Sequence, residues 1–264
     1  MSKTAVITGA TTGIGAAYAK RLATEGFDLI VTGRRREIIQ KLADDLIAQH
    51  GVKVNVIIAE LSDDNDFKKV VDAIRATEDI EMLINNAGYS GYTQHFVETD
   101  MAEHEKMVKV HQIVPMRLIS IVAPAMIKHG SGAIINVCSL IAFLPLPSWS
   151  VYAGTKAFLK CYSECIYQEF RDKGIRVQAL CPGFTRTDFA KNYYSKERYE
   201  QTESKVKRMI MSPEKVVDYS LKSLKKDKFI CIPGISNKAM CKLFLSLPMG
   251  IYCGLVKRMT PFKP

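Results

Sequence analysis

The sequence predicts an α/β fold: a doubly wound parallel sheet with helices on both faces, built as a single domain. Two observations lead to this prediction. Short apolar, β-branched runs alternate with helical stretches, and the first run is followed at once by a glycine-rich turn and a helical pattern. Strands that alternate with helices pair in parallel, because each helix returns the chain to the same end of the sheet.

The strands predicted in the first half are residues 3–8, 28–32, 54–59 and 82–84, and those in the second half are 133–137, 177–180 and 229–232. The first helix runs from the glycine turn to Gly26. With 264 residues, 47% of them hydrophobic, the chain can fill one such core. We expect one domain over 1–234, with a substrate lid at about 184–211, and a C-terminal extension over 235–264.

The turn after the first strand has the sequence GATTGIG, residues 9–15. Glycines let the backbone approach a pyrophosphate, and the N-terminus of the following helix supplies N–H groups and a positive dipole. A glycine turn alone is also common between an ordinary strand and helix. Its place directly after the first strand favours the phosphate site.

The second strand ends at Gly33 and is followed by three arginines. In dinucleotide-binding folds this position meets the adenosine ribose, where an acid binds a 2′-hydroxyl and an arginine binds a 2′-phosphate. No acid stands there, so Arg34 and Arg35 favour NADP(H), and NAD(H) is the less favoured cofactor. The alternative is that the arginines are solvated charge at a helix start.

Ser139, Tyr152 and Lys156 form the strongest chemical pattern in the chain. Four residues apart is about one helical turn, so Tyr152 and Lys156 share a face, and the ammonium can stabilise a neighbouring phenolate. A serine at a strand end can present its hydroxyl to the same substrate oxygen. A tyrosine and a lysine at this spacing are, by themselves, more often packing and surface residues than catalytic ones. The other motifs in the chain favour the catalytic interpretation.

Four motifs in order, TGATTGIG, NNAG at 85–88, the serine with YxxxK, and Pro182-Gly183, resemble the short-chain dehydrogenase/reductase family in its common single-domain form, over about residues 3–234. The resemblance extends to its hydroxysteroid dehydrogenase and ketoacyl reductase-like members. It implies a Rossmann-type fold and an NAD(P)-dependent enzyme acting on CH–OH groups.

The resemblance also implies residue roles. Tyr152 would exchange a proton with the substrate oxygen, Lys156 would lower the pKa of that tyrosine and hold the nicotinamide ribose, and Ser139 would hydrogen-bond the same oxygen. The other implied cofactor contacts are Gly9, Thr11, Thr12, Gly13, Ile14 and Gly15 at the pyrophosphate, Arg34 and Arg35 at the ribose phosphate, Glu60 and Leu61 at the adenine, Asn86, Ala87 and Gly88 along the riboses, and Pro182, Gly183, Thr185 and Thr187 at the carboxamide.

One position departs from the family pattern. Many members carry an asparagine in the helix before the serine strand, where it supports a water chain behind the lysine, and His111 aligns with it. Histidine can still hydrogen-bond a water and can titrate near neutral pH. The alternatives are that His111 takes part in proton relay or that it only fills the slot. The competing hypothesis is that the chain is a regulatory protein, which binds the dinucleotide but catalyses the reaction only weakly.

Apolar and aromatic residues surround the positions where a substrate would bind. The predicted pocket residues are Tyr89, Tyr92, Ile141, Phe143, Leu146, Trp149, Phe184 and Tyr193. They favour a bulky hydrophobic ketone or secondary alcohol of steroid or bile-acid type. The alternative substrate is a 3-ketoacyl chain or another carbonyl compound. For each single residue, the alternative interpretation is ordinary loop packing.

The extension 235–264 contains five basic residues and no acid, half of the net charge of +10. We expect it to pack on the same domain or a partner subunit, with weak contact to a membrane surface as the alternative. The sequence predicts a homodimer or homotetramer in the cytoplasm, with reduced thiols and no nucleic-acid partner. No cluster with metal-ligand spacing is present, so no metal is expected.

Overall fold

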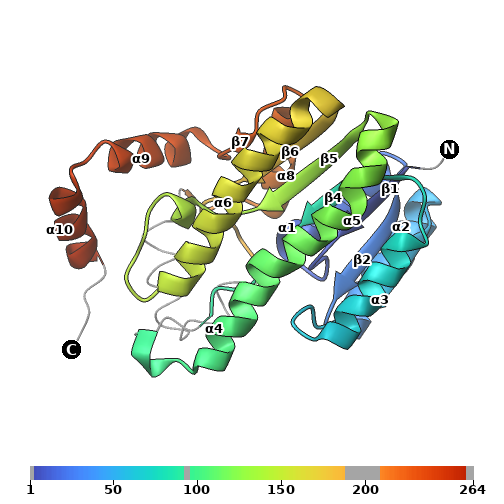
Figure 1. Ribbon diagram of the computed structural model, residues 1–264, viewed down its shortest axis with the longest axis horizontal. Coiled ribbons are helices and arrows are strands. Elements are labelled where there is room, and N and C mark those ends of the chain that lie inside the picture. Colours follow the sequence, from blue (N-terminus) through green and yellow to red (C-terminus); the bar gives the residue numbers. More distant parts are fainter. Residues whose placement is uncertain (1–2, 92–95, 188–208, 260–264) are drawn as a thin grey trace.

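A computed structural model describes residues 3–91, 96–187 and 209–259. Its core is a seven-stranded parallel sheet in the order β3-β2-β1-β4-β5-β6-β7 (Figure 1). The strands are β1 (Thr4–Ile7), β2 (Asp28–Gly33), β3 (Val54–Ile58), β4 (Ile80–Asn85), β5 (Gly132–Val137), β6 (Ile175–Leu180) and β7 (Ile230–Cys231). The predicted fold class is confirmed, and each strand lies where the sequence predicts it, with ends that differ by one or two residues.

The helices before β7 lie in the connections between successive strands, and α9 and α10 follow β7. They are α1 (Gly13–Thr24), α2 (Arg36–His50), α3 (Asp64–Arg75), α4 (Met101–Val108), α5 (Val114–His129), α6 (Ser150–Phe170), α8 (Pro213–Leu224), α9 (Ile235–Leu245) and α10 (Met249–Met259). Side-chain caps begin several of them: Asp63 accepts from the Asp66 N–H at α3, and Asp100 accepts from the Ala102 N–H at α4.

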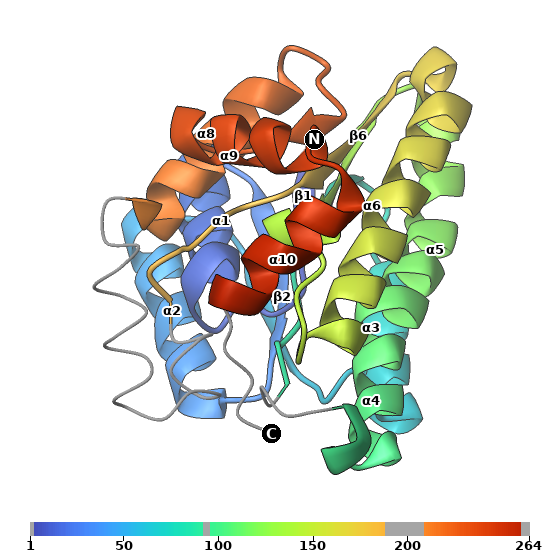
Figure 2. The same cartoon turned by 90° about the vertical axis from the view of Figure 1, so that its left-hand side faces the viewer.

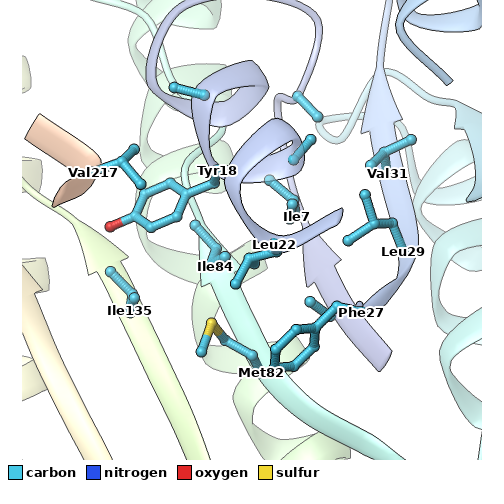
Figure 3. Packing of buried hydrophobic residues seen from close by; sticks show 14 of the residues in the cluster. Ile7, Tyr18, Leu22, Phe27, Leu29, Val31, Met82, Ile84, Ile135 and Val217 are labelled. Carbon is cyan, nitrogen blue, oxygen red and sulfur yellow. The ribbon is translucent and has the colours of Figure 1, made fainter. Parts of the chain in front are cut away.

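One hydrophobic cluster joins the sheet to α1, α2 and α8. Tyr18 and Leu22 of α1 are fully buried against strand residues such as Ile84 and Ile135 (Figure 3). The Tyr18 hydroxyl donates to Ser220 Oγ at 2.5 Å, so its one polar group is satisfied inside this cluster. A hydrophobic side chain of this size contributes roughly 1.5–3 kcal/mol on full burial.

A second cluster covers the opposite face, where α3, α5 and α6 pack on the sheet. Its strand residues include Val6, Leu83 and Ile134, which alternate with the residues of the first cluster along the same strands. The central strands are therefore buried on both faces, as a parallel sheet requires.

The order in which the strands are added to the sheet reverses between β1 and β4. β1 pairs with both β2 and β4, while the chain after β1 leads toward β2 and β3 and the chain after β4 leads toward β5 and β6. The loops that follow β1 and β4 therefore separate, and open α/β sheets bind their ligands in the crevice formed at this point. The glycine turn and the NNAG segment are those two loops.

α4 and α5 are joined by a five-residue π-helical turn, Lys109–Ile113. Within the described ranges, Met101–His129 is the one helical stretch whose length and apolar composition would suffice to cross a membrane, and 50% of its apolar window is buried inside the protein. Val114, Leu118 and Val122 are among the α5 residues in the second core cluster.

The C-terminal helices lie against the same domain. Figure 2 shows α10 crossing in front of the sheet. Tyr252 and Val256 of α10 are buried, and the Tyr252 hydroxyl donates to the Pro145 carbonyl at 2.7 Å. This contact joins the extension to the loop between β5 and α6.

Candidate active site

The structure brings Ser139, Tyr152 and Lys156 to the end of β5. Ser139 follows β5 and begins a short 3-10 turn, Leu140–Ala142, where its Oγ accepts from the Ile141 N–H at 3.3 Å. Tyr152 and Lys156 lie in the first two turns of α6, and both are buried. Lys156 Nζ is 5.9 Å from the centre of the Tyr152 ring. The predicted spacing therefore brings Tyr152 and Lys156 side by side, and Ser139 begins the turn that follows the same strand.

Lys156 is held from the side of the sheet. Its Nζ donates to the Val137 carbonyl at 2.8 Å, at the last residue of β5. Only 4% of the residue is exposed, and burial lowers the pKa of its ammonium from 10.5 to about 8. Lys156 therefore keeps its positive charge at neutral pH, and this charge can stabilise an anion nearby.

His111 lies on the π-helical turn between α4 and α5, with 1% of its surface exposed. Its Nε2 accepts from the backbone N–H of Tyr89 at 3.0 Å, and its Nδ1 lies 2.9 Å from Thr155 Oγ1. The ring meets the Tyr152 ring edge to face, with centroids 5.7 Å apart. His111 thus joins the loop after β4 to α6, immediately behind the tyrosine.

Gly88 lies where this loop approaches the buried side chains most closely. A Cβ on Gly88 would lie 2.8 Å from His111 Nε2 and 3.5 Å from Lys156 Nζ. The missing side chain therefore allows the loop to contact both residues. Ala87 N–H donates to Thr8 Oγ1 at 3.0 Å, which fixes the same loop to the end of β1.

Asn86 ties the loop after β4 to the glycine turn. Its side-chain amide donates to the carbonyls of Thr8 at 3.0 Å and Gly9 at 2.9 Å. Gly9 has a φ of +67°, and a Cβ there would lie 2.8 Å from Ala87 Cα. Asn86 was predicted to contact the riboses of the cofactor. In the structure its amide hydrogens point to the glycine turn.

The glycine turn fits a dinucleotide pyrophosphate. The predicted contact residues from Gly9 to Gly15 run from the end of β1 into the first turn of α1, which begins at Gly13 and carries no acid. The first N–H groups of a helix have no acceptor within it, so these donors are available to an anion. Ile14 also packs against the first core cluster, and Thr11 lies against Gly33.

The segment after β6 closes over the same turn. Pro182 is buried, and Gly183 and Thr185 are half-buried. A Cβ on Gly13 would lie 2.8 Å from Thr187 Cγ2. Thr185 Oγ1 donates to the Gly183 carbonyl at 3.1 Å. The structure therefore places the Pro182–Thr187 segment beside the glycine turn, where a ligand could contact both.

The two arginines after β2 are directed differently. Arg34 Nη1 donates to Glu60 Oε2 at 2.9 Å, and Arg35 Nη2 donates to Thr12 Oγ1 at 2.9 Å. Partial burial raises the pKa of Glu60, and hydrogen bonds from Arg34 and Ser62 outweigh it, so the net pKa is below its usual value. The adjacent Leu61 is buried in the second core cluster.

A cavity of about 280 Å³ runs beside these residues, from Arg34 and Glu60 at one end to Trp149 and Tyr152 at the other. Apolar side chains surround Tyr152 at that end: Met107, Tyr89, Ile141, Leu146 and Trp149 form one cluster with it. Four of these were predicted as pocket residues, and they do gather around the tyrosine.

Of the other predicted pocket residues, the structure describes Phe143 and Phe184. Phe143 packs in a separate cluster with Cys138 and Leu159, and Lys160 Nζ lies 5.0 Å from the centre of its ring. Phe184 is 47% exposed. Tyr92 and Tyr193 lie outside the described residues, as does most of the lid segment 184–211.

Sequence reasoning missed several polar residues behind the site. Thr155 is buried and lies between His111 and the carbonyl of Tyr152, to which its hydroxyl donates at 2.8 Å. A buried chain runs from Asn85 Nδ2 to Asn136 Oδ1 at 2.8 Å and from Asn136 Nδ2 to Ser163 Oγ at 2.8 Å. A polar residue inside an otherwise apolar predicted strand, such as Asn136, is the signal that could have found this chain.

Comparison with known proteins gives the family. Residues 3–198 match the family model for short chain dehydrogenases. The chain is 31% identical over 190 residues to a very-long-chain 3-oxoacyl-CoA reductase of Rattus norvegicus, and the match covers 71% of this chain and 61% of the relative. The chain thus spans about three fifths of the length of that relative.

Two solved structures resemble almost the whole chain. One is a short-chain dehydrogenase from Sphingobium yanoikuyae in complex with NADPH, with 30% identity, a TM-score of 0.82, and 99% and 98% of the two chains covered. Another is a bulky-bulky ketone specific alcohol dehydrogenase from Comamonas testosteroni, with 30% identity, a TM-score of 0.76, and 93% and 95% covered. This protein therefore belongs to the short-chain dehydrogenase/reductase family.

Proposed function

We propose that this enzyme uses NADP(H) to interconvert a ketone and a secondary alcohol on a bulky hydrophobic substrate of steroid or bile-acid type. The observation that carries the proposal is the apolar wall packed around Tyr152, a cluster that contains Met107, Ile141, Leu146 and Trp149. Of these four, Met107 and Trp149 also line the cavity. Such a wall favours a large apolar group beside the reacting oxygen. The similarity to the bulky-bulky ketone specific alcohol dehydrogenase from Comamonas testosteroni supports the same substrate class.

The proposed roles follow from the positions of the side chains. Tyr152 gives its phenolic proton to the carbonyl oxygen during reduction and accepts it back during oxidation. Lys156, which is buried and positively charged, stabilises the phenolate form, and Ser139 hydrogen-bonds the substrate oxygen. The nicotinamide supplies the hydride when bound, and the protein holds the substrate carbon near it.

NADP(H) is the proposed cofactor because Arg34 and Arg35 stand where the 2′-phosphate of the adenosine ribose would lie, with no acid at the end of β2. The Sphingobium relative was solved in complex with NADPH, which supports the choice. Glu60 pairs with Arg34 at 2.9 Å and would have to share that arginine with the phosphate.

A 3-ketoacyl substrate is the second candidate. It is favoured by the similarity to the very-long-chain 3-oxoacyl-CoA reductase of Rattus norvegicus. A long acyl chain would also suit an apolar wall. The two candidates differ in shape and charge, because an acyl-CoA carries phosphates and a steroid or bile acid does not.

A substrate panel tests the proposal. NADPH oxidation is followed with steroid ketones, oxo bile acids, 3-ketoacyl-CoA esters and small aryl ketones, and the ratio of kcat/KM values is compared. We expect the steroid or bile-acid ketones to be the best substrates by at least about tenfold, the discrimination that one or two apolar contacts provide. A preference for 3-ketoacyl-CoA would reject the substrate proposal in favour of the second candidate.

The catalytic proposal has its own test. Tyr152→Phe should bind NADPH with nearly unchanged affinity and lose most turnover, by roughly 10²-fold or more, because the proton donor is gone. Tyr162→Phe is the matched control, since Tyr162 is a half-buried tyrosine on the same helix that stacks on Phe158, away from the site. Normal turnover in both Tyr152→Phe and Tyr162→Phe would reject the role of Tyr152 as the proton donor.

A further inference from the structure

The C-terminal helices α9 and α10 expose an unusual amount of apolar surface. Ile235 is 83% exposed, Met249 is 70% exposed and Ile251 is 54% exposed, and Leu243 and Leu245 are also exposed. Contiguous exposed apolar surface on a water-soluble domain marks a place of contact with something else. Both helices lie on the side of the molecule that faces the viewer in Figure 2.

Positive charge accompanies this apolar surface. Lys238 and Lys242 lie one turn apart on the exposed side of α9, next to the stripe formed by Ile235, Ala239 and Leu243. The sequence from 235 to 264 adds Lys257, Arg258 and Lys263 and contains no aspartate or glutamate. Exposed apolar residues beside lysines, without acids, are the composition of helices that lie in the plane of an anionic bilayer.

The inner sides of the two helices are occupied by the domain. Asn237 of α9 is buried, and its Nδ2 donates to the Pro233 carbonyl at 2.7 Å. Tyr252 and Val256 of α10 are buried, and Ile251 and Leu255 are exposed about 100° further around the helix. These contacts hold both helices on the domain and leave their other faces exposed.

We propose that the exposed faces of α9 and α10 dock on an anionic lipid bilayer. A second copy of this chain fits the same surface less well. In a twofold contact the acid-free patch of one copy would meet the identical patch of the other, which brings Lys238 and Lys242 of both copies together without a compensating carboxylate from 235–264. Anionic headgroups supply the missing negative charge, and the acyl boundary receives Ile251 and Leu255.

The docked orientation has a consequence for the site. The Tyr252 hydroxyl is bonded to the Pro145 carbonyl, and the neighbouring Leu146 belongs to the apolar wall around Tyr152. On the other side, a Cβ on Gly183 would lie 2.7 Å from Asn237 Oδ1, so α9 contacts the segment that follows β6. The bilayer-facing helices therefore contact Pro145, next to the apolar wall, and Gly183 in the Pro182–Thr187 segment.

Vesicle flotation tests the proposal without any measurement of turnover, so its outcome is independent of the proposed substrate. The full chain is mixed with vesicles of phosphatidylcholine, with or without phosphatidylserine, and the bound fraction is measured at increasing salt. We expect binding to the anionic vesicles, weak binding to the neutral ones, and release as the ionic strength approaches about 1 M.

Two double variants examine the two contributions. Lys238→Gln with Lys242→Gln should weaken partition to anionic vesicles by roughly thirtyfold, since each surface cation contributes about fivefold. Ile251→Ser with Leu255→Ser should weaken partition to both vesicle types. The matched control is Lys53→Gln with Lys128→Gln, which removes two exposed lysines at the start of β3 and the end of α5 and should leave partition unchanged.

The same samples are examined by analytical ultracentrifugation, and retained NADPH binding shows that each variant is folded. Equal binding to neutral and anionic vesicles, or no binding to either, would overturn the proposal. So would a change of oligomeric state in the Ile251→Ser, Leu255→Ser variant with vesicle binding unaffected, because that result assigns the surface to a second copy of the chain.

Discussion

The Nδ1 atom of His111 and the Oγ1 atom of Thr155 lie 2.9 Å apart, and this contact determines which nitrogen of the imidazole carries a proton. The Thr155 hydroxyl already donates to the Tyr152 carbonyl, so its oxygen accepts from His111. The other nitrogen, Nε2, accepts from the Tyr89 N–H. Burial, with the nearby Lys156 charge, holds the pKa of His111 well below its usual value. His111 is therefore a neutral Nδ1–H imidazole whose two nitrogens are both bonded, which makes it a positioning residue.

His111 should consequently not titrate in the working range of the enzyme. Nitrogen-15 NMR of labelled histidine is expected to show one ring with a protonated Nδ1 and an unprotonated Nε2, unchanged from about pH 8 to about pH 5, because burial opposes the charged form. His129, which is exposed at the end of α5, provides the comparison within the same spectrum. A His111 signal that titrates with the pH profile of kcat would show that it relays protons instead.

Replacing His111 should distinguish the contributions of its two hydrogen bonds to kcat. His111→Gln can still accept from Tyr89 and loses the bond to Thr155, while Thr155→Val removes the same bond from the other side. Each change is expected to lower kcat about tenfold, as one buried hydrogen bond does, with no new ionisation in the pH profile. The double variant should lose little more than either single variant. Fully additive losses would mean that the two residues act independently.

Lys156 should reduce the stability of the protein at neutral pH. Burial lowers its pKa from 10.5 to about 8, so between these values the folded protein binds fewer protons than the unfolded chain, and stability rises with pH. Lys156→Met should therefore raise the free energy of unfolding by about 1–3 kcal/mol near neutral pH while abolishing turnover, and this gain should disappear above about pH 10.5. Urea denaturation at several pH values measures it.

Lys160→Met is the matched control for that measurement. Lys160 lies one turn further along α6 and pairs with Glu164 at 2.8 Å. Its replacement removes a partly exposed ion pair, so the change in stability should stay within about 1 kcal/mol. A stabilisation by Lys160→Met equal to that by Lys156→Met would contradict the assigned cost of burying the Lys156 ammonium.

Glu60 should limit the preference for NADPH over NADH. Its carboxylate pairs with Arg34 and, with a pKa below its usual value, is ionised throughout the neutral range. Glu60→Gln removes a negative charge beside the proposed 2′-phosphate and should raise the ratio of kcat/KM for NADPH to that for NADH about fivefold. Arg34→Ala should lower the same ratio by at least about tenfold.

The control for this pair is Glu25→Gln, which breaks a comparable ion pair with Arg21 at the end of α1. The cofactor ratio should not change in that variant. A lower ratio in Glu60→Gln would show that Glu60 helps Arg34 to bind the phosphate rather than competing with it, and an unchanged ratio in Arg34→Ala would place the phosphate elsewhere.

Gly88 should not tolerate a methyl group. The Cβ of Gly88→Ala would meet His111 Nε2 at 2.8 Å and displace either the imidazole or the loop after β4. We expect a loss of about 2 kcal/mol in stability together with a large loss of kcat. Gly154→Ala is the matched control, because Gly154 lies in α6 between Tyr152 and Lys156, is exposed, and has open space around its Cβ. It should gain about 0.5–1 kcal/mol and keep turnover.

The sequence was sufficient for the features that repeat along the chain. The alternation of apolar runs and helical stretches predicts the seven strands, and the four-residue spacing of Tyr152 and Lys156 predicts that they share a helix face. Both depend on local periodicity, which a single sequence displays directly.

The partners of these residues could not be predicted in the same way. Thr155 contacts a histidine 44 positions away, and Met107 reaches Tyr152 from a different helix. Phe143 and Leu146 lie three residues apart in one loop and yet pack in different clusters. Such contacts depend on how the loop after β5 turns, and no periodic pattern records that turn.

The π-helical turn at Lys109–Ile113 contains one residue more than an α-helical turn would need. Each residue of an α-helix advances the chain by about 100° around the axis, so this extra residue rotates all of α4 by that angle relative to α5. Because of this rotation, Met107 faces Tyr152 while α5 keeps its apolar face on the sheet. The orientation of the pocket wall is thus set by a single inserted position, and deleting it would turn Met107 away from the tyrosine without altering any residue that touches a ligand.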